Sequence, residues 1–529
     1  MNNLKHTIYS SMVLALLAAP LTSCTGDLDQ YPHTETTSKE VYTTVSNYEA
    51  VLGKIYTSMV INGQGKGGDN ADLSSNNGYD YMRSFFNLQE CGTDEVASTW
   101  LSGDKTGDIT YLSWDANDPW VADMYYRIYY NITLCNEFLR HCTEDVVNSY
   151  SGEAQDSMRH FRAEARFMRA LFYYHALDLF RYVPFVSEND PVGSFTPPRY
   201  EPQQTFDFIE SELKDIVADL YPASQCPYGR ASQGAAYTLL AKLYLNAEVY
   251  TGKDHYTDCI TACNNAIAQG YTLDSNYAHL FNADNDKRTD EIIFALPVDA
   301  THTVSWGSTT YIVCGEISNT SATLHPADYG VESAWGMFRA RGECTSKFGD
   351  GDKRFMFYTD GQSQYFSKDI TDQTQGYFPV KWTNLTDDGQ TASNTADGGV
   401  DTDFPLFRLA DVYLMYAEAV VRGGQGGSRA QALSYVNQIR KRAYGSTAGD
   451  ITDAQLTKDF LLDERCRELY LECTRRTDLI RYNAFTTANY VYQWKGGTMN
   501  GMAVDSKYNI YPIPTTELTA NPDLHNDNY

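Results

Sequence analysis

The feature that most constrains this fold is a helical repeat of apolar side chains that runs unbroken through Glu153–Phe180. Apolar residues that recur every three or four positions form one face of an α-helix, and that face must be buried. Pro184 then stops the pattern, since proline is poorly tolerated inside a helix. The inward face carries Phe161, Ala165, Met168, Leu171, Phe172, His175, Leu179 and Phe180.

The same periodicity recurs in shorter segments, which indicates a mainly α-helical protein. Thr205–Leu220 pairs with Ser232–Tyr250, and Tyr256–Gln269 follows a Thr-Gly-Lys turn. Helix pairs that repeat every thirty to forty residues or so favour tetratricopeptide-like stacking, in which each pair covers the next. Further helices are predicted at residues 41–60, 118–142, 407–421, 428–443 and 452–471, the last capped by Thr452.

Between the helical parts lies a loop-rich segment, residues 291–403. Two pieces read as strands, Glu291–Pro297 and Thr309–Cys314, among long stretches of Gly, Asp, Thr and Ser. Long loops in an ordered protein are usually functional surfaces. We therefore predict a helical part at 41–290, a ligand-binding insertion at 291–403 and a second helical part at 404–529, with residues 24–529 forming one unit.

The N-terminus has the form of an export signal. The apolar run Ile8–Leu21 follows Lys5 and is too short to span a bilayer. It ends in Leu21-Thr22-Ser23-Cys24, the pattern of a bacterial lipoprotein. We predict a signal peptide over 1–23, lipidation at Cys24 and a polar tether over 24–40, so that lipid alone anchors the chain. The alternative is an ordinary secreted protein with a chance cysteine.

The composition narrows the class of ligand. The net charge is −27, which argues against nucleic acid and anionic lipid, because both require clustered Lys and Arg. The chain has 41 Tyr, 23 Phe and 7 Trp. Such rings suit the alternately apolar and hydroxylated faces of sugars. Packing at the interfaces between helices nevertheless explains most of the aromatic residues.

No motif in the chain predicts a cofactor or a metal. Gly63-x-Gly65-x-x-Gly68 has the spacing of a dinucleotide fingerprint, but a helix precedes it and none follows. The acidic loop of Asp284, Asp286, Asp290 and Glu291 could hold structural calcium, but it lacks the glycine of an EF-hand, which favours a solvated turn. We expect no metal site.

Two groups of residues are expected to be structural. The ten cysteines after Cys24 contain no Cys-x-x-Cys pair, so we expect mostly free, buried thiols. Arg162, Arg166 and Arg169 repeat along one helix face and need carboxylates between them. Glu468 and Glu472 are candidates for that role.

Taken together, these segments resemble one family. The resemblance to the SusD/RagB family, surface-exposed glycan-binding outer-membrane lipoproteins, runs from Cys24 almost to the C-terminus. It implies four tetratricopeptide-like helix pairs, a position on the cell exterior, and a TonB-dependent outer-membrane transporter of the SusC type as partner. The matching segments are 24–29 (CTGDLD), 162–171 (RAEARFMRAL), 178–180 (DLF), 184–185 (PF), 407–414 (FRLADVYL) and 511–514 (YPIP).

Local matches to a starch-binding member of that family imply the site residues. Trp100 and Trp335 match two aromatic rings of its glycan-binding arc, and Trp306 stands in place of a third, a tyrosine. Arg83 matches a sugar-contacting arginine. Where the family pattern has an asparagine this chain has Gly103, with Asp104 next. The resemblance therefore implies a glycan site at Trp100, Trp306, Trp335, Arg83 and Asp104.

The residues support this independently, because all three tryptophans fall in predicted loops rather than on helix faces. The alternative is that they fold back as plugs. We expect a non-catalytic receptor for α-glucan of the starch type. A competing hypothesis for the ligand is an α-1,6-glucan such as dextran. Competing hypotheses for the function are a surface glycoside hydrolase and a scaffold that binds only other proteins.

Overall fold

The computed structural model describes residues 41–65, 71–73, 80–193, 195–392 and 399–529. The predicted signal peptide, Cys24 and the tether over 24–40 lie outside the described residues, as does part of the Gly63–Gly68 loop. The chain divides into two compact units, residues 1–48 and 49–529, of which the first is described only from residue 41. The account below concerns the second unit.

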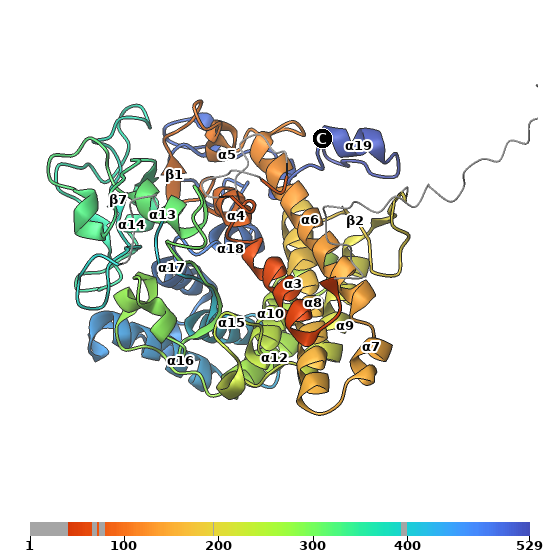
Figure 1. Cartoon of the computed structure of the whole chain (residues 1–529). Coiled ribbons are helices and arrows are strands. Elements are labelled where there is room, and N and C mark those ends of the chain that lie inside the picture. Colours follow the sequence, from red (N-terminus) through yellow and green to blue (C-terminus); the bar gives the residue numbers. More distant parts are fainter. Residues whose placement is uncertain (1–40, 66–70, 74–79, 194, 393–398) are drawn as a thin grey trace, which may run out of the picture. The chain divides into compact units, whose positions relative to one another are not determined.

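The described elements are mostly helical, as predicted (Figure 1). The helices are α3 (Val45–Thr57), α4 (Tyr81–Glu90), α5 (Gly107–Tyr111), α6 (Pro119–His141), α7 (Glu144–Ser149), α8 (Glu153–Phe180), α9 (Pro202–Ile216), α10 (Gln233–Leu245), α11 (Ala247–Thr251), α12 (Tyr256–Ile267), α13 (Ser308–Glu316), α14 (Gly342–Thr345), α15 (Leu409–Val421), α16 (Arg429–Tyr444), α17 (Lys458–Leu469), α18 (Arg475–Arg481) and α19 (Thr515–Ala520). Short 3-10 turns connect them.

The long helices stack in sequence order, in the tetratricopeptide-like manner predicted. α6 packs on α8, α8 on α9, α10 on α12, and α15 on both α12 and α16. The predicted helix Glu153–Phe180 coincides with α8. α10 carries Ala235, Ala236 and Ala241 at full burial, and these small side chains let its neighbours approach closely. Among the described helices, none combines the length and apolarity needed to cross a bilayer.

Within the described residues, the strands form four separate two-stranded antiparallel ribbons. They pair β1 (Val96–Ser98) with β5 (Phe338–Ala340), β2 (Val183–Pro184) with β3 (Arg199–Tyr200), β4 (Ile292–Leu296) with β8 (Phe404–Arg408), and β6 (Phe357–Tyr358) with β7 (Phe378–Pro379). The β4–β8 ribbon sets Ile292 opposite Arg408, so the two ends of the predicted insertion meet.

One predicted strand is wrong. Thr309–Cys314 lies inside helix α13, of which all nine residues are buried. A segment that is buried on every side shows no alternation between apolar and polar faces. The pattern of residues therefore could not distinguish this β-branched run in a buried helix from one in a strand. The predicted strand Glu291–Pro297 is confirmed as β4.

The predicted partners of the α8 arginines are also wrong. Arg166 pairs with Glu212 and Asp215, and Arg169 pairs with Glu188 and Glu212. These carboxylates come from α9 and the loop after α8, because those segments pack directly on the arginine face.

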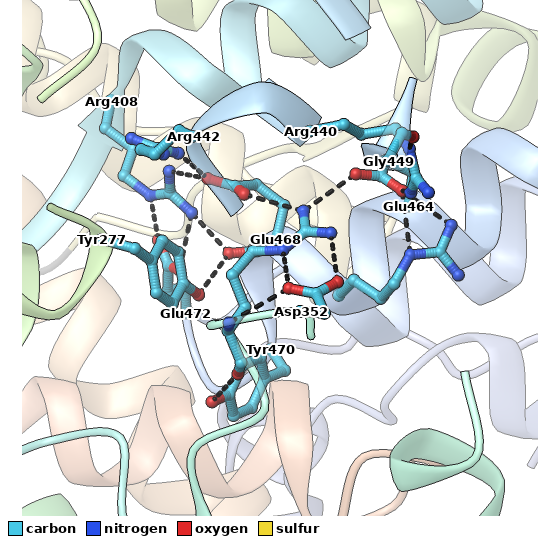
Figure 2. Close-up of polar contacts among 12 residues, drawn as sticks. Tyr277, Asp352, Arg408, Arg440, Arg442, Gly449, Glu464, Glu468, Tyr470 and Glu472 are labelled. Carbon is cyan, nitrogen blue, oxygen red and sulfur yellow. Dashed lines mark hydrogen bonds and ion pairs between the residues drawn. The ribbon is translucent and has the colours of Figure 1, made fainter. Parts of the chain in front are cut away.

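Glu468 belongs instead to a buried ion cluster, drawn in Figure 2. Its carboxylate accepts hydrogen bonds from Arg408 at 2.6 Å, from Arg354 at 3.0 Å and from Arg442. Glu464 and Glu472 extend the cluster to Arg440 and to Lys381. Burial opposes ionisation, but Arg442, Arg408 and Arg354 lower the pKa of Glu468 to about 2.

The ten cysteines of the described residues are all free thiols, as expected. Nine are buried and Cys226 is half-buried. Cys344 and Cys466 lie with their sulfur atoms 3.5 Å apart, as a hydrogen-bonded pair. Burial raises the pKa of the Cys344 thiol, and it raises that of Cys226 to about 12.

Candidate functional site

The β1–β5 ribbon brings two of the predicted site tryptophans together. Ser98 lies opposite Phe338, and because the strands are antiparallel, Trp100 just after β1 meets Trp335 just before β5. The indole centroids are 6.3 Å apart and the ring planes are inclined by 31°. The Trp335 backbone N–H donates to the Cys314 carbonyl at 2.8 Å, which fixes the segment against the end of α13.

Trp306 joins them from the segment before α13. Its indole lies 6.3 Å from that of Trp335, with an interplanar angle of 50°. Trp335 is therefore the ring that contacts both others, in a group that we call the tryptophan row: Trp100, Trp335 and Trp306. Trp306 is 44% exposed, and the other two are half-buried. The plug alternative is therefore wrong: the three rings lie side by side, and each is accessible from solvent.

A buried carboxylate ties the Trp306 segment to α4. Asp80 caps α4 by accepting from the Arg83 backbone N–H at 2.9 Å, and it also accepts from the Ser305 hydroxyl at 2.6 Å and the Ser308 N–H at 3.1 Å. Burial raises the pKa of Asp80, while these hydrogen bonds act against that rise. A side chain at Gly307 would collide with the Asp80 carboxylate, so only glycine fits there.

Arg83 and Asp104 lie beneath the tryptophan row. One Arg83 Nη donates to the Trp306 carbonyl at 2.5 Å, and the other donates to Asp104 Oδ2 at 2.9 Å. The guanidinium also lies 4.2 Å from the centroid of the Tyr311 ring. Arg83 is only 3% exposed and Asp104 only 6%. The structure thus places both predicted residues next to the tryptophan row, with their side chains buried.

Polar residues beside the row were missed from the sequence. Asn319 is exposed, and its Oδ1 accepts from Gln373 at 2.9 Å. A Cβ atom at Gly336 would come within 2.9 Å of that oxygen, so this amide lies against the backbone next to Trp335. The two residues come from separate loops of the insertion. No local pattern could pair them, although both lie in the segment predicted to bind ligand.

The acidic loop is dispersed rather than convergent. Asp284 pairs with Lys287 at 2.7 Å, whereas Glu291 is buried between Arg408 and Arg442. Within the described part of the chain, no group of three or more His, Cys, Asp or Glu side chains has a metal-binding arrangement. A calcium site in this loop is therefore not supported by its geometry.

Two family models match consecutive parts of the chain. Residues 28–245 match the family described as "Starch-binding associating with outer membrane", and residues 244–529 match the SusD family. The chain is 33% identical to the starch-binding protein SusD of Bacteroides thetaiotaomicron, over 99% of this chain and 98% of that protein.

Solved structures agree on the fold. A SusD superfamily protein from Parabacteroides distasonis superposes with a TM-score of 0.70 at 22% identity, covering 94% of this chain and all of that one. A surface glycan-binding protein from B. thetaiotaomicron, solved with laminarihexaose, gives 0.68 at 17% identity, over 92% of this chain and all of that one. With the fold and both family models in agreement over nearly its whole length, this chain belongs to the SusD family.

Proposed function

We propose that this protein is a non-catalytic cell-surface receptor that captures α-glucan of the starch type on the tryptophan row. It then passes the glycan to a TonB-dependent outer-membrane transporter of the SusC type, while lipid at Cys24 holds it to the membrane. The starch-binding relative at 33% identity supports the ligand class. The description of the N-terminal family model supports association with the outer membrane.

The observation that carries this proposal is the inclination of neighbouring rings in the row. Each neighbouring pair of indoles has its centroids 6.3 Å apart, and the two pairs of ring planes are inclined by 31° and by 50°. Coplanar rings would suit a flat, extended glycan. Rings inclined to one another allow successive sugar faces of a coiled α-glucan each to lie against one ring, where the apolar face of the sugar leaves water.

In this proposal, Arg83 and Asp104 act as positioning residues rather than as sugar contacts. Their side chains are buried, and they connect the Trp306 backbone to the loop that carries Trp100. A bridge of this kind fixes the separation of the two outer rings. A preorganised row loses less conformational freedom when a glycan binds.

An α-1,6-glucan such as dextran is the second candidate ligand. Gly103 favours it, because the hydrogen-bonding side chain that the family resemblance places there is absent. The Asn319 amide lies next to Gly336, beside Trp335, and together with Gln373 could supply polar contacts to either linkage.

Calorimetry of the mature protein with maltoheptaose, amylopectin, dextran and laminarin tests the proposal. We expect binding to the starch-type ligands, and a loss of at least tenfold, or about 1.4 kcal/mol, in Trp335→Ala. Phe355→Ala is the matched control, since Phe355 is exposed but lies outside the row. Unchanged binding in Trp335→Ala would overturn the site, and preference for dextran would change the ligand. Release of reducing ends over hours would indicate a hydrolase instead, and no binding to any glycan would leave the scaffold hypothesis.

A further inference from the structure

Arg339 is a buried cation that forms no ion pair among the described residues. It is the middle residue of β5, and it is fully buried. Burial lowers the pKa of its guanidinium to about 9, with no carboxylate acting in the other direction. The arginines of the cluster around Glu468 differ, because each of them is paired with carboxylates. Burying an unpaired charge costs free energy, so an arginine at this position needs a reason beyond packing.

The guanidinium of Arg339 is directed at the backbone that follows Trp335. Its Nη1 donates to the Phe338 carbonyl at 2.7 Å and to the Gly336 carbonyl at 3.2 Å. The Gly336 carbonyl also accepts from the Thr99 hydroxyl at 3.1 Å, which joins it to the segment that follows β1. Arg339 thus holds the turn that begins directly after Trp335.

The turn itself is tightly anchored. Gly336 has a φ of 58°, in the left-handed region, and a Cβ atom there would lie 2.9 Å from Asn319 Oδ1, so only glycine fits. The backbone N–H groups of Trp335, Gly336 and Met337 donate to carbonyls in or just after α13, at 2.8, 2.7 and 2.9 Å. The N–H side of the turn is therefore anchored on α13, and Arg339 contacts its carbonyl side.

The surroundings of Arg339 fix the guanidinium in turn. It lies 3.6 Å from the centroid of the Phe378 ring in β7, within the range of a cation–π interaction. The backbone of β5 is joined to the same segment by the Ala340 N–H, which donates to the Tyr377 carbonyl at 2.8 Å. A Cβ atom at Gly376 would come within 3.0 Å of the Arg339 Cβ atom, so the loop passes close to the arginine side chain. A side chain enclosed in this way can hold the turn in one position.

We propose that Arg339 is a positioning residue of the tryptophan row. It fixes the turn after Trp335 and so holds this indole, the ring that contacts both others, in the orientation that a glycan meets. The inference rests on the proposed function, because the row is its binding surface. A ring that is ordered before the glycan arrives loses less conformational freedom on binding. The unpaired charge then lowers stability while it raises affinity, a trade-off that is common at functional sites.

Arg339→Met tests this inference, because methionine is a long apolar side chain that has no charge and no donor for the two carbonyls. Removal of an unpaired buried charge should leave the urea midpoint within about 0.5 M of that of the parent protein, or raise it. Binding of maltoheptaose, measured by calorimetry, should weaken about fivefold, since the indole must then be ordered when the glycan binds. Arg339→Lys keeps the charge and one donor group on a shorter side chain, and should recover part of that affinity.

Arg181→Met is the matched control. Arg181 is also a buried arginine that forms no ion pair among the described residues, and its guanidinium lies 4.6 Å from the centroid of the Tyr250 ring. Burial lowers the pKa of this guanidinium as well. Arg181 directly follows α8, outside the segments that carry the three tryptophans, so its replacement should leave the affinity unchanged.

Hydrogen exchange of the peptide that contains residues 335–338 supplies a readout that needs no ligand. Its N–H groups should exchange about tenfold faster in Arg339→Met than in the parent protein. They should exchange at the parental rate in Arg181→Met.

Unchanged affinity or unchanged exchange in Arg339→Met would overturn the inference. A fall of more than about 1 M in its urea midpoint would equally overturn it, because Arg339 would then support the whole fold. If Arg339→Met does not fold, Arg339→Lys is judged by the same criteria. If the parent protein does not bind maltoheptaose, the proposed function fails. The exchange rate then decides alone whether Arg339 fixes the turn: faster exchange supports this, and unchanged exchange overturns it.

Discussion

The tryptophan row and the buried ion cluster around Glu468 are both assembled from segments far apart in sequence, but they use their side chains in opposite ways. The row leaves three large apolar rings accessible to solvent. The cluster, drawn in Figure 2, buries the side chains of Arg354, Arg408 and Arg442 with their carboxylates. The interactions of the cluster are already made in the free protein, whereas those of the row are left for a ligand.

This contrast predicts where mutations act. Charges in the cluster have lost their hydration, so removing one partner leaves others buried and uncompensated. Rings in the row are still partly hydrated, so removing one changes folding little and ligand binding much. Stability and affinity should therefore respond to separate sets of residues.

The largest expected effect is that of Glu468→Gln. The neutral amide cannot balance Arg408, Arg354 and Arg442, so we expect a loss of about 3–5 kcal/mol in the free energy of unfolding. Urea denaturation measures this loss as a fall in the midpoint. Glu144→Gln is the control, because the exposed Glu144 pairs with Arg162 at the surface and should cost under about 1 kcal/mol. Equal losses of unfolding free energy in the two variants would contradict the expected difference between buried and exposed ion pairs.

The next largest effect is expected from acid, which should protonate buried, ion-paired carboxylates inside and outside the cluster. The pKa of Glu468 and that of Glu418 are each lowered to about 2, against burial, by neighbouring arginines. A glutamate whose pKa is lower in the folded than in the unfolded protein stabilises the fold when it is ionised. This stability is present above the unfolded-state pKa of about 4.5 and is lost as the pH falls toward 2. The thermal midpoint should therefore fall steeply over that range. A flat profile between pH 4.5 and 2 would contradict the assignment.

Two carboxyl groups act in the other direction at higher pH. Burial raises the pKa of Asp403 and that of Glu95 to about 7. The protonated forms of these two groups favour the folded state. Their contribution to stability is therefore complete below about pH 4 and is lost as the pH rises to 7. We therefore expect the thermal midpoint to be highest near pH 4.5 and lower on either side. Replacing Asp403 with Asn should flatten the decline toward pH 7.

The smallest expected effect on stability is that of Trp306→Ala. Because this indole is 44% exposed, we expect a loss of about 1 kcal/mol or less. Trp382→Ala is the contrasting variant, since Trp382 is fully buried and should cost about 3–5 kcal/mol. Both changes are read from urea midpoints. A large loss in Trp306→Ala would mean that the row supports the fold as well as a ligand.

Elements with one apolar and one polar face were predictable from the sequence. α8 matches the predicted range because its periodicity is long and unbroken. α4 was not predicted, and α13 was taken for a strand, because every residue of both helices is buried and neither presents a polar face. The helix predicted at 452–471 begins later, with Thr457 as its cap, while Thr452 caps a separate short turn.

The candidate site shows the same limit. The tryptophans could be chosen from their residue type, their predicted loops and the family resemblance. Their order in space follows from the β1–β5 register, which links residues more than 200 positions apart. The partners of Glu468 could not be chosen among 41 Lys and Arg residues, because pairing depends on which segments pack together.

The free thiols make this protein a reporter of its own unfolding. In the native state nine of the ten cysteines in the described residues are buried, so an alkylating reagent should modify Cys226 first and the others only as their surroundings open. The order of modification, read by mass spectrometry of peptides, would then show which helix layers separate first. No engineered label would be needed for that map.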